Sequence, residues 1–435
     1  MQEPKPDPAA QVRGGVVVPA ASWLGRGVAL SVILALGFGL IVPKIAGAAF
    51  LLLSLVAVIW LEPLLFHGAW RMRAEERLLA IAVAGFVAVW LLAWCLNGLD
   101  AAGLGDAGRI LRLLLIVPLT LLLARVEGLD RAWWTGLTIG SIGAGLYAIG
   151  YALGEQSGEW AERVGGSTNP IYFGGLSYAF ALMLLPRAAD RRLGRWARVA
   201  AGAGVGLGLA ASALSGSRGA LLTLPPLLVI YVLFMAPSVH GLRRLAAPAA
   251  VLALVVGLSF APGVPFGERL MDAWASMHSR DAVLDLEDTL AVRWALWKVS
   301  AAAIVEHPWL GGGPGLFRTA LEQAVAAGQA EPVLLRYHHP HNQYLSALLL
   351  AGPVGLLALL ALFSVPLLQT WRAMLAASEY RGRHLAWSAL TGVLVMLALA
   401  VGESIFQRNA GVVWFAILVA TGLAVARPAL HHVPR

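Results

Sequence analysis

Three histidines occur within four positions of the sequence, at His338, His339 and His341. An imidazole with an ordinary pKa near 6.5 accepts and returns a proton at neutral pH, so this segment is a candidate for acid–base chemistry. Imidazole also binds zinc, but no carboxylate lies at the spacing typical of a zinc site, and we expect no metal there. Each histidine taken alone could instead cap the helix that follows.

Two arginines form a second group of candidates, because the planar guanidinium stays ionised and donates two parallel hydrogen bonds to phosphate. Arg218 lies in a tight link of small residues that includes Ser217, and Arg293 precedes Lys298 by five positions. A charge at membrane depth is costly and is usually functional. The alternatives are that Arg218 reaches a lipid headgroup or closes the turn, and that Arg293 is an interfacial cation.

Other polar clusters favour structural interpretations. Glu403 and Arg408 bracket a turn and are expected to pair with each other. The run Gly311–Gly315 could cradle phosphate through its backbone N–H groups, but no Lys-Ser/Thr follows it as in a P-loop, so a plain turn is favoured. The acidic segment 281–288 is expected to be a solvated loop.

The composition decides which elements must position these residues. Of the 435 residues, 59% are hydrophobic and 13% are charged, against about 25% charged in a soluble domain. A water-soluble fold of this size could not cover its surface with so few charges. An ordinary soluble enzyme, a disordered chain and a nucleic-acid-binding protein are therefore excluded. The single cysteine, Cys95, excludes an intrachain disulfide.

The hydropathy pattern predicts an all-α integral membrane protein, since a spanning helix needs about 20 mostly apolar residues. We expect a disordered tail over 1–21, nine spans within 22–261, a loop over 262–341, three spans within 342–426 and a short tail over 427–435. The twelve expected spans centre on 22–42, 44–62, 76–96, 108–124, 132–153, 169–186, 196–214, 218–236, 244–261, 342–370, 384–403 and 409–426.

The positions of the basic residues predict the orientation of these spans. With the N-terminus in the cytoplasm, 20 of the 32 Lys and Arg residues fall on cytoplasmic segments, as the positive-inside rule requires. Both termini are then cytoplasmic, and the 80-residue loop between spans nine and ten lies on the outer face. The formal net charge of +8 reflects this topology, with anionic membrane lipids rather than nucleic acid as its partner.

The long loop is expected to be partly helical. Trp294 and Trp297 recur at helical spacing within Asp288–Val305, and two tryptophans suit a helix that lies at the membrane interface. Connections of this length are uncommon unless they carry function. We therefore expect the loop to carry the catalytic elements.

These motifs together resemble the superfamily of O-antigen ligases, O-antigen polymerases and bacterial O-oligosaccharyltransferases. The pair His341-Asn342, followed after nine residues by Gly352-Pro353-Val354-Gly355, resembles the H-N-x9-G-x-x-G signature of O-antigen ligases. Twelve spans and one large periplasmic loop are similar to the superfamily's topology. Further elements resemble its other patterns: Ser217-Arg218-Gly219, Arg293 with Trp297, and His307-Pro308 with Gly311 and Gly313.

The resemblance implies a glycosyltransferase of the Gram-negative inner membrane with its active site facing the periplasm. Its donor is an O-antigen glycan linked to undecaprenyl pyrophosphate, its acceptor is lipid A–core, and it needs no metal or other cofactor. His341 is then the base and His339 the second candidate. Arg218 and Arg293 bind the pyrophosphate and stabilise the negative charge that develops on it. The substrate-binding candidates beside them are Ser217, Lys298, Asn342 and Trp297, with interface anchoring as the alternative for Trp297.

Other functions remain open at this point. An O-antigen polymerase or a protein O-oligosaccharyltransferase would use the same donor with another acceptor. A multi-span transporter of an anionic or lipid-linked substrate would also suit twelve spans. A transporter would place its site near the membrane midplane, whereas a transferase would gather Arg218, Arg293 and His341 at one outer cavity.

Overall fold

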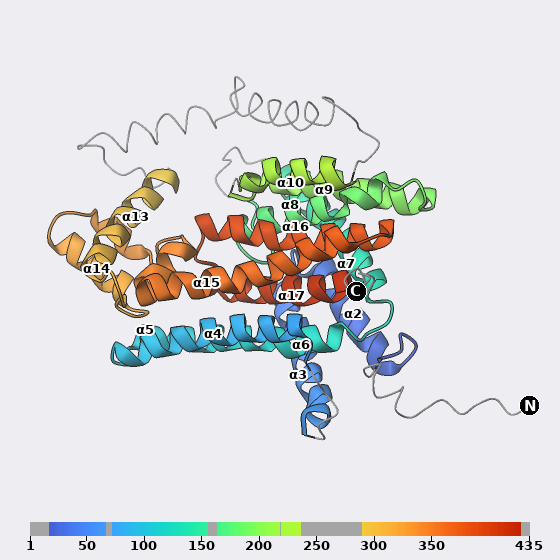
Figure 1. The fold of residues 1–435 in the computed structure, drawn as a ribbon. Coiled ribbons are helices and arrows are strands. Elements are labelled where there is room, and N and C mark those ends of the chain that lie inside the picture. The colour runs from blue at the N-terminus through green and yellow to red at the C-terminus, as the bar shows by residue number, and fades with distance from the viewer. Residues whose placement is uncertain (1–16, 67–71, 155–162, 218, 236–288, 428–435) are drawn as a thin grey trace, which may run out of the picture.

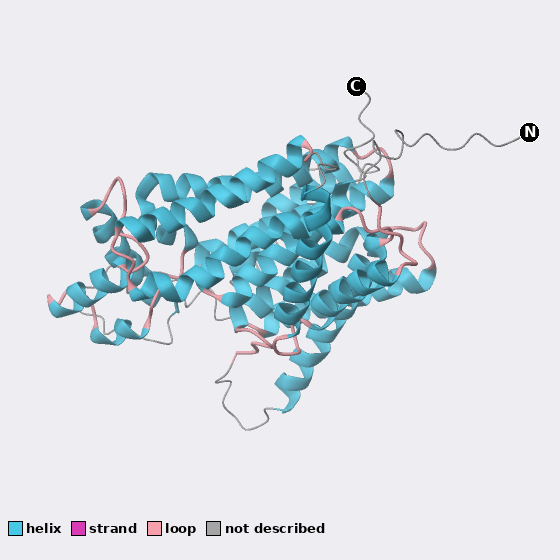
Figure 2. Cartoon of the chain, turned by 90° about the horizontal axis from the view of Figure 1, so that it is seen from below, coloured by secondary structure: helices cyan, strands magenta, loops and turns pink. Residues whose placement is uncertain are grey.

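The computed structural model describes residues 17–66, 72–154, 163–217, 219–235 and 289–427, and all of its long elements are helices (Figures 1 and 2). The all-α prediction is therefore confirmed for the described residues. The α-helices are α2 (Trp23–Phe38), α3 (Ile45–Phe66), α4 (Ala74–Leu96), α5 (Ala101–Leu111), α6 (Ile116–Leu123), α7 (Leu129–Gly154), α8 (Pro170–Ala189), α9 (Arg195–Leu214), α10 (Leu224–Ile230), α13 (Thr289–Glu306), α14 (Leu316–Ala326), α15 (Gln343–Ala376), α16 (Tyr380–Gly402) and α17 (Asn409–Ala426).

Eight of the described helices are long and apolar enough to cross a membrane: α3, α4, α7, α8, α9, α15, α16 and α17. Two more expected spans appear as shorter apolar segments, α2 and Leu224–Met235. The expected span over 108–124 is divided among the end of α5, a 3-10 turn (Arg112–Leu115) and α6. The expected span over 244–261 lies outside the described residues, so the count of twelve stays a prediction.

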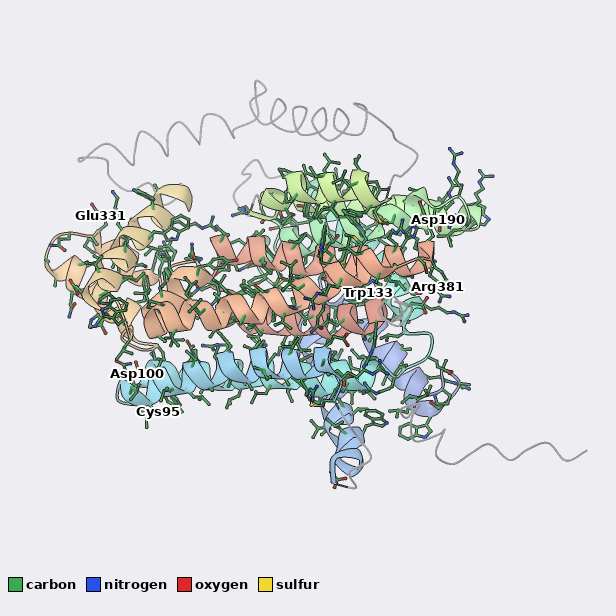
Figure 3. The ribbon with its side chains drawn as sticks, viewed as in Figure 1. Cys95, Asp100, Trp133, Asp190, Glu331 and Arg381 are labelled. Carbon is green, nitrogen blue, oxygen red and sulfur yellow. The ribbon has the colours of Figure 1, made fainter. Side chains whose placement is uncertain are left out.

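The core of the bundle is formed by α8, α16 and α17, the most deeply buried of the candidate spans. Two buried tryptophans join neighbouring helices through their indole N–H groups. Trp133 donates to Ser388 Oγ at 2.9 Å, and Trp387 donates to the Leu182 carbonyl at 2.9 Å. Because hydrocarbon offers no hydrogen-bond partners, such internal pairing is required at membrane depth. Figure 3 shows Trp133 within the bundle, whereas Asp100 and Glu331 lie toward one end and Asp190 and Arg381 toward the other.

The helix α15 is interrupted at Gly352, whose φ of +56° is outside the range of a right-handed helix. The interruption leaves the carbonyl groups of Leu349 and Leu350 without helical partners. These carbonyls accept hydrogen bonds from the backbone N–H groups of Gly312 and Gly313, at 2.9 and 3.1 Å. The turn interpretation of the glycine run is thus confirmed, because these two N–H groups bind the kink of α15 and are not available to phosphate.

Replacing Gly352 with alanine is expected to destabilise the protein. A Cβ atom there would lie 2.4 Å from the Trp309 carbonyl oxygen, and the positive φ alone costs a non-glycine residue about 1–2 kcal/mol. We expect Gly352→Ala to lower the melting temperature in detergent by several degrees. Gly85→Ala is the matched control, because a Cβ on this helical glycine of α4 meets nothing within 4 Å. Equal melting temperatures for the two variants would contradict this explanation of the kink.

The end of the bundle opposite the start of α17 is closed by a buried ionic cluster. Glu76 is buried, lies 3.3 Å from Arg125 and also pairs with Arg427, which follows α17. Arg381, at the start of α16, pairs with Asp130 at the same end. Arginines that the sequence assigns to cytoplasmic segments therefore gather at one end of the bundle, and the histidine segment lies at the other.

Candidate active site

The histidine segment is fixed by the first turn of α15. Asn342 is the N-cap residue, and its side-chain oxygen accepts hydrogen bonds from the N–H groups of Tyr344 and Leu345, at 2.9 and 3.0 Å. Its own backbone N–H donates to Ser404 Oγ at 3.2 Å. These bonds join the histidine segment to the turn between α16 and α17. The side-chain oxygen of Asn342 thus acts as a helix cap, and the expected binding of substrate by Asn342 stays a prediction.

Glu403 is the centre of the site. It directly follows α16, its exposed fraction is 0%, and its carboxylate lies 3.3 Å from Nδ1 of His341. Nδ1 of His339 is 3.7 Å away and Nε of Arg408 is 3.5 Å away. The expected pairing of Glu403 with Arg408 is confirmed. Its contact with the histidines was missed, because 62 residues separate Glu403 from His341 and no local spacing relates them.

The protonation of this cluster follows from burial and charge. Burial alone would raise the pKa of Glu403, but the hydrogen bond from His341, the neighbouring imidazoles and the Arg408 guanidinium lower it to about 2. An ionised carboxylate only accepts hydrogen bonds, so Nδ1 of His341 must carry the proton that it donates. In the neutral form of His341 the nitrogen without a proton is then Nε2, which makes Nε2 the candidate proton acceptor.

The other two histidines are in different environments. Burial and the neighbouring His341 lower the pKa of His339 to about 3, so its imidazole is neutral and forms no ion pair with Glu403. Its Nδ1 accepts a hydrogen bond from the backbone N–H of His341 at 3.4 Å. His338 is exposed. The geometry thus separates a base candidate, His341, from a residue that positions its backbone, His339.

His341 also has an unusual backbone conformation. Its φ is +51°, in the left-handed region that residues other than glycine rarely occupy. The ring packs against His339 with centroids 4.3 Å apart and against Tyr337 at 5.6 Å. Strained conformations of this kind persist where surrounding contacts hold them, and they cluster at functional sites.

The helix α13 agrees with the helix expected over 288–305 and brings Arg293 to this cluster. The guanidinium of Arg293 packs against Gly402, with its central carbon 3.8 Å from where a Cβ on Gly402 would lie. Burial lowers the pKa of Arg293, and the charge of Glu403 acts in the opposite direction. Among the described residues no hydrogen bond of the Arg293 guanidinium is recorded, and its charge faces that of Glu403.

Two further candidates on α13 have structural contacts. The indole N–H of Trp297 donates to the Pro340 carbonyl at 2.9 Å, so Trp297 holds the histidine segment from the side of α13. Lys298 is exposed, and its ammonium lies 5.7 Å from the Trp294 ring centroid. No contact within the described chain joins Lys298 to the histidines.

The remaining candidates lie near α8 or outside the described residues. Ser217 is buried, and its hydroxyl donates to the Ile171 carbonyl at 3.3 Å. Arg218 and the acidic segment 281–288 are outside the described residues, so the expected meeting of Arg218 with Arg293 stays a prediction.

One group of three residues could hold a metal ion. The ligand atoms of His339, His341 and Glu403 lie within 4.8 Å of one another. Two histidines and a carboxylate are a ligand set that zinc uses. The guanidinium groups of Arg293 and Arg408 act on the same carboxylate, which lowers its affinity for a cation.

Residues 203–360 match the family described as O-antigen ligase. This segment belongs to the O-antigen ligase family. The match confirms the resemblance inferred from the motifs, and it spans α13, the histidine segment and the kink of α15. The chain is also 23% identical over 333 residues to an uncharacterized protein of Haemophilus influenzae, which covers 75% of this chain and 80% of that protein.

Within this O-antigen ligase segment the signature residues have distinct physical tasks. His341 faces the carboxylate, Asn342 caps α15, and Gly352 permits the kink that binds the glycine run. Gly355 allows the two halves of α15 to pack closely, since a Cβ there would lie 2.3 Å from the Ala347 carbonyl oxygen. The nine-residue spacing therefore equals the length of helix between the cap and the kink.

The low pKa of His339 predicts how stability depends on pH. The unfolded chain binds a proton at His339 below an ordinary pKa near 6.5, whereas the folded chain does so only below about 3. The free energy of unfolding therefore falls as the pH falls from about 6.5 toward 3. Between pH 7.5 and pH 5 the loss is about 2 kcal/mol. Melting temperatures of the wild type and His339→Asn at both pH values test this. A decrease of the same size in both proteins would contradict it.

Proposed function

We propose that the protein transfers an O-antigen glycan from undecaprenyl pyrophosphate to lipid A–core at the periplasmic face of the inner membrane, which completes lipopolysaccharide. The observation that carries this proposal is the contact of His341 with the buried Glu403 beside the Arg293 guanidinium. It supplies a proton acceptor and a phosphate-binding cation at the end of a membrane bundle. The family match supports the choice of donor.

In the proposed reaction the acceptor hydroxyl oxygen attacks C1 of the first donor sugar. The C1–O bond to pyrophosphate breaks, and undecaprenyl pyrophosphate leaves with the bonding electrons. The hydroxyl proton passes to Nε2 of His341, and the charge of Glu403 stabilises the imidazolium that forms. Arg293, with Arg218, stabilises the charge that builds on the departing pyrophosphate.

The proposed orientation follows from the basic residues. Arg125, Arg381 and Arg427 mark the cytoplasmic end of the bundle. Both termini are then cytoplasmic, and the site at the opposite end faces the periplasm. The undecaprenyl tail of the donor stays in the surrounding membrane lipids. No metal or other cofactor takes part, because arginine supplies the positive charge at the phosphates.

The decisive assay uses the full chain in liposomes with EDTA, undecaprenyl-pyrophosphate oligosaccharide as donor and rough lipopolysaccharide as acceptor. We expect a gel shift of the acceptor that resists EDTA. We also expect Arg293→Ala to lower transfer at least about 100-fold, since removing one donor to a developing oxyanion costs that much. Arg372→Ala is the matched control, because Arg372 is exposed near the other end of α15.

Each alternative gives a different result in the same assay. Growth of the donor glycan without an acceptor shift would identify an O-antigen polymerase. Transfer that EDTA abolishes and zinc restores would assign the three-residue group to a metal. Donor movement across the bilayer without any transfer would identify a transporter, and wild-type activity of Arg293→Ala would refute the phosphate clamp.

A further inference from the structure

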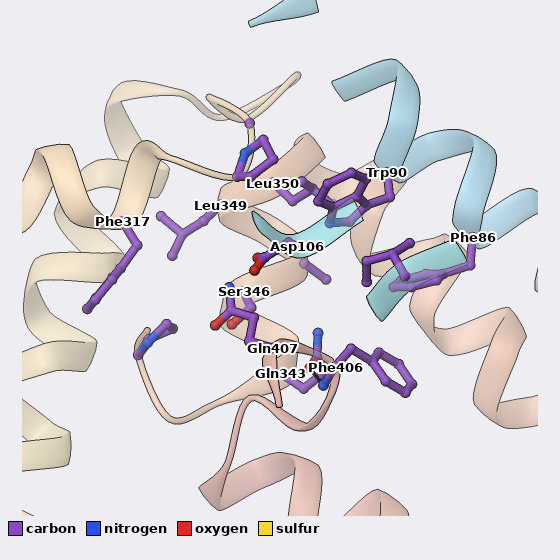
Figure 4. A pocket seen from close by; sticks show the side chains of 15 residues that line it. Phe86, Trp90, Asp106, Phe317, Gln343, Ser346, Leu349, Leu350, Phe406 and Gln407 are labelled. Atoms are coloured by element: carbon purple, nitrogen blue, oxygen red, sulfur yellow. Dashed lines mark hydrogen bonds between the residues drawn. The ribbon is translucent and has the colours of Figure 1, made fainter. Parts of the chain in front are cut away.

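A pocket of about 490 Å³, counted with its open mouth, adjoins the histidine segment (Figure 4). Its walls come from α4, α5, the start of α14, the first turns of α15 and the turn Ile405–Gln407.

Aromatic rings and polar groups share the lining of this pocket. Trp90, Phe317 and Phe406 offer apolar faces, and Asp106 and Gln407 lie between them (Figure 4). Within the described part of the chain, Oε1 of Gln407 is buried without a hydrogen-bond partner. A buried acceptor of this kind is normally satisfied, so a ligand hydroxyl is a fitting partner.

The amide of Gln343 is the second oriented polar group in the wall. Its oxygen accepts a hydrogen bond from the Phe406 backbone N–H at 2.9 Å. The fixed oxygen leaves the amide N–H groups of Gln343 to donate to a ligand. Apolar rings with a few oriented hydroxyl partners suit a sugar ring, which has apolar C–H faces and polar edges.

The charge of the lining excludes a phosphate group. Among the residues that the structure describes, no lysine or arginine lines the pocket. Asp106 contributes a carboxylate, which pairs with Arg109 outside the wall. In the proposed function the pyrophosphate lies at Arg293, which is not among the lining residues. The pocket therefore suits a neutral part of a substrate rather than the head of the donor.

The pocket is joined to the proposed base by a short hydrogen-bonded path. Ser346, in the wall, lies 2.9 Å from Ser404 through their hydroxyl oxygens. The backbone N–H of Ser404 donates to Oε1 of Glu403 at 3.2 Å, and Glu403 holds His341. The lining residue Pro340 directly precedes His341 in the chain, so a ligand seated there lies close to the proposed base.

We infer, on the basis of the proposed function, that this pocket binds a neutral sugar ring of the acceptor and presents its hydroxyl to His341. Trp90 packs on one face of the ring, and Asp106 with the amides of Gln343 and Gln407 binds its hydroxyl groups. A site built on such hydrogen bonds selects strongly against sugars that lack the matching hydroxyl.

Steady-state transfer in the liposome assay tests this placement. We expect Trp90→Ala and Asp106→Asn to raise the acceptor KM at least about tenfold, with the donor KM within about twofold of wild type. Trp90→Phe keeps a ring and should recover most of the affinity. Trp23→Ala is the matched control, since Trp23 is 85% exposed. An unchanged acceptor KM in both pocket variants, or a rise in the donor KM instead, would overturn the inference.

A binding measurement keeps the inference testable if the proposed transfer fails. Dephosphorylated core oligosaccharide is titrated into the full chain in detergent and followed by calorimetry. Binding to the wild type that weakens at least about tenfold in Trp90→Ala and Asp106→Asn supports the sugar site, whatever the activity. Absent binding, or equal binding to wild type and variants of equal melting temperature, would refute it.

Discussion

Replacing His341 with asparagine is expected to lower glycan transfer by about 10²–10⁴-fold, the usual contribution of a general base. Asparagine tolerates the left-handed backbone that His341 adopts, so the first turn of α15 should persist. Donor binding should be unchanged, because Arg293 and not His341 holds the pyrophosphate in the proposed reaction. Single-turnover rates and separate donor-binding curves measure the two effects.

The neighbouring histidines provide the controls for that experiment. His338 is exposed, so His338→Asn should transfer glycan at the wild-type rate. His339→Asn retains an oxygen that accepts the backbone N–H of His341, and it should lose less activity than His341→Asn. If His341→Asn weakened donor binding and spared turnover, its assignment as the base would be wrong.

Replacing Glu403 with glutamine is expected to lower turnover by about 10²–10³-fold. The amide keeps the shape of the side chain but loses the charge that fixes Nδ1–H of His341 and stabilises the imidazolium. Glu403 does not touch the substrate in the proposed reaction and is a positioning residue. Turnover should fall while the KM for the donor stays near that of wild type, and initial rates at varied donor concentration measure both.

A double variant distinguishes this role from a general loss of structure. If Glu403 acts through His341, then Glu403→Gln combined with His341→Asn should be about as inactive as His341→Asn alone. Additive losses would mean that Glu403 acts elsewhere. Glu331→Gln is the matched control, since Glu331 is exposed in the connection between α14 and α15. Glu403→Asp, which restores the carboxylate, should recover part of the turnover.

The helices of this protein were predictable because hydrocarbon imposes a simple rule on the chain. Each span must be long, apolar and internally hydrogen-bonded, so hydropathy located α4, α7, α16 and α17 closely. The Trp294–Trp297 spacing likewise located α13. The break between α5 and α6 was not predicted, since an uninterrupted apolar run does not record where its backbone changes geometry.

The candidate site was only partly predictable. The histidine segment and Arg293 were identified from residue type, because imidazole and guanidinium have few substitutes for their chemistry. The resemblance already favours His341 over His339 as the base, and the burial of His339 and the position of Glu403 agree with that choice, which stays a prediction. Asn342 and Trp297 have structural contacts that residue type does not distinguish from substrate contacts.

By itself, the sequence determined the class of fold, the likeness to the O-antigen ligase family and the residues that are candidates for the chemistry. Each of these follows from the types of residues and their local spacing. Only the tertiary structure decided that Glu403 contacts His341, that the glycine run binds the kink of α15, and that α4 and α5 wall a pocket near the proposed base. These contacts join segments many residues apart, and which groups meet depends on how the helices pack rather than on any local pattern.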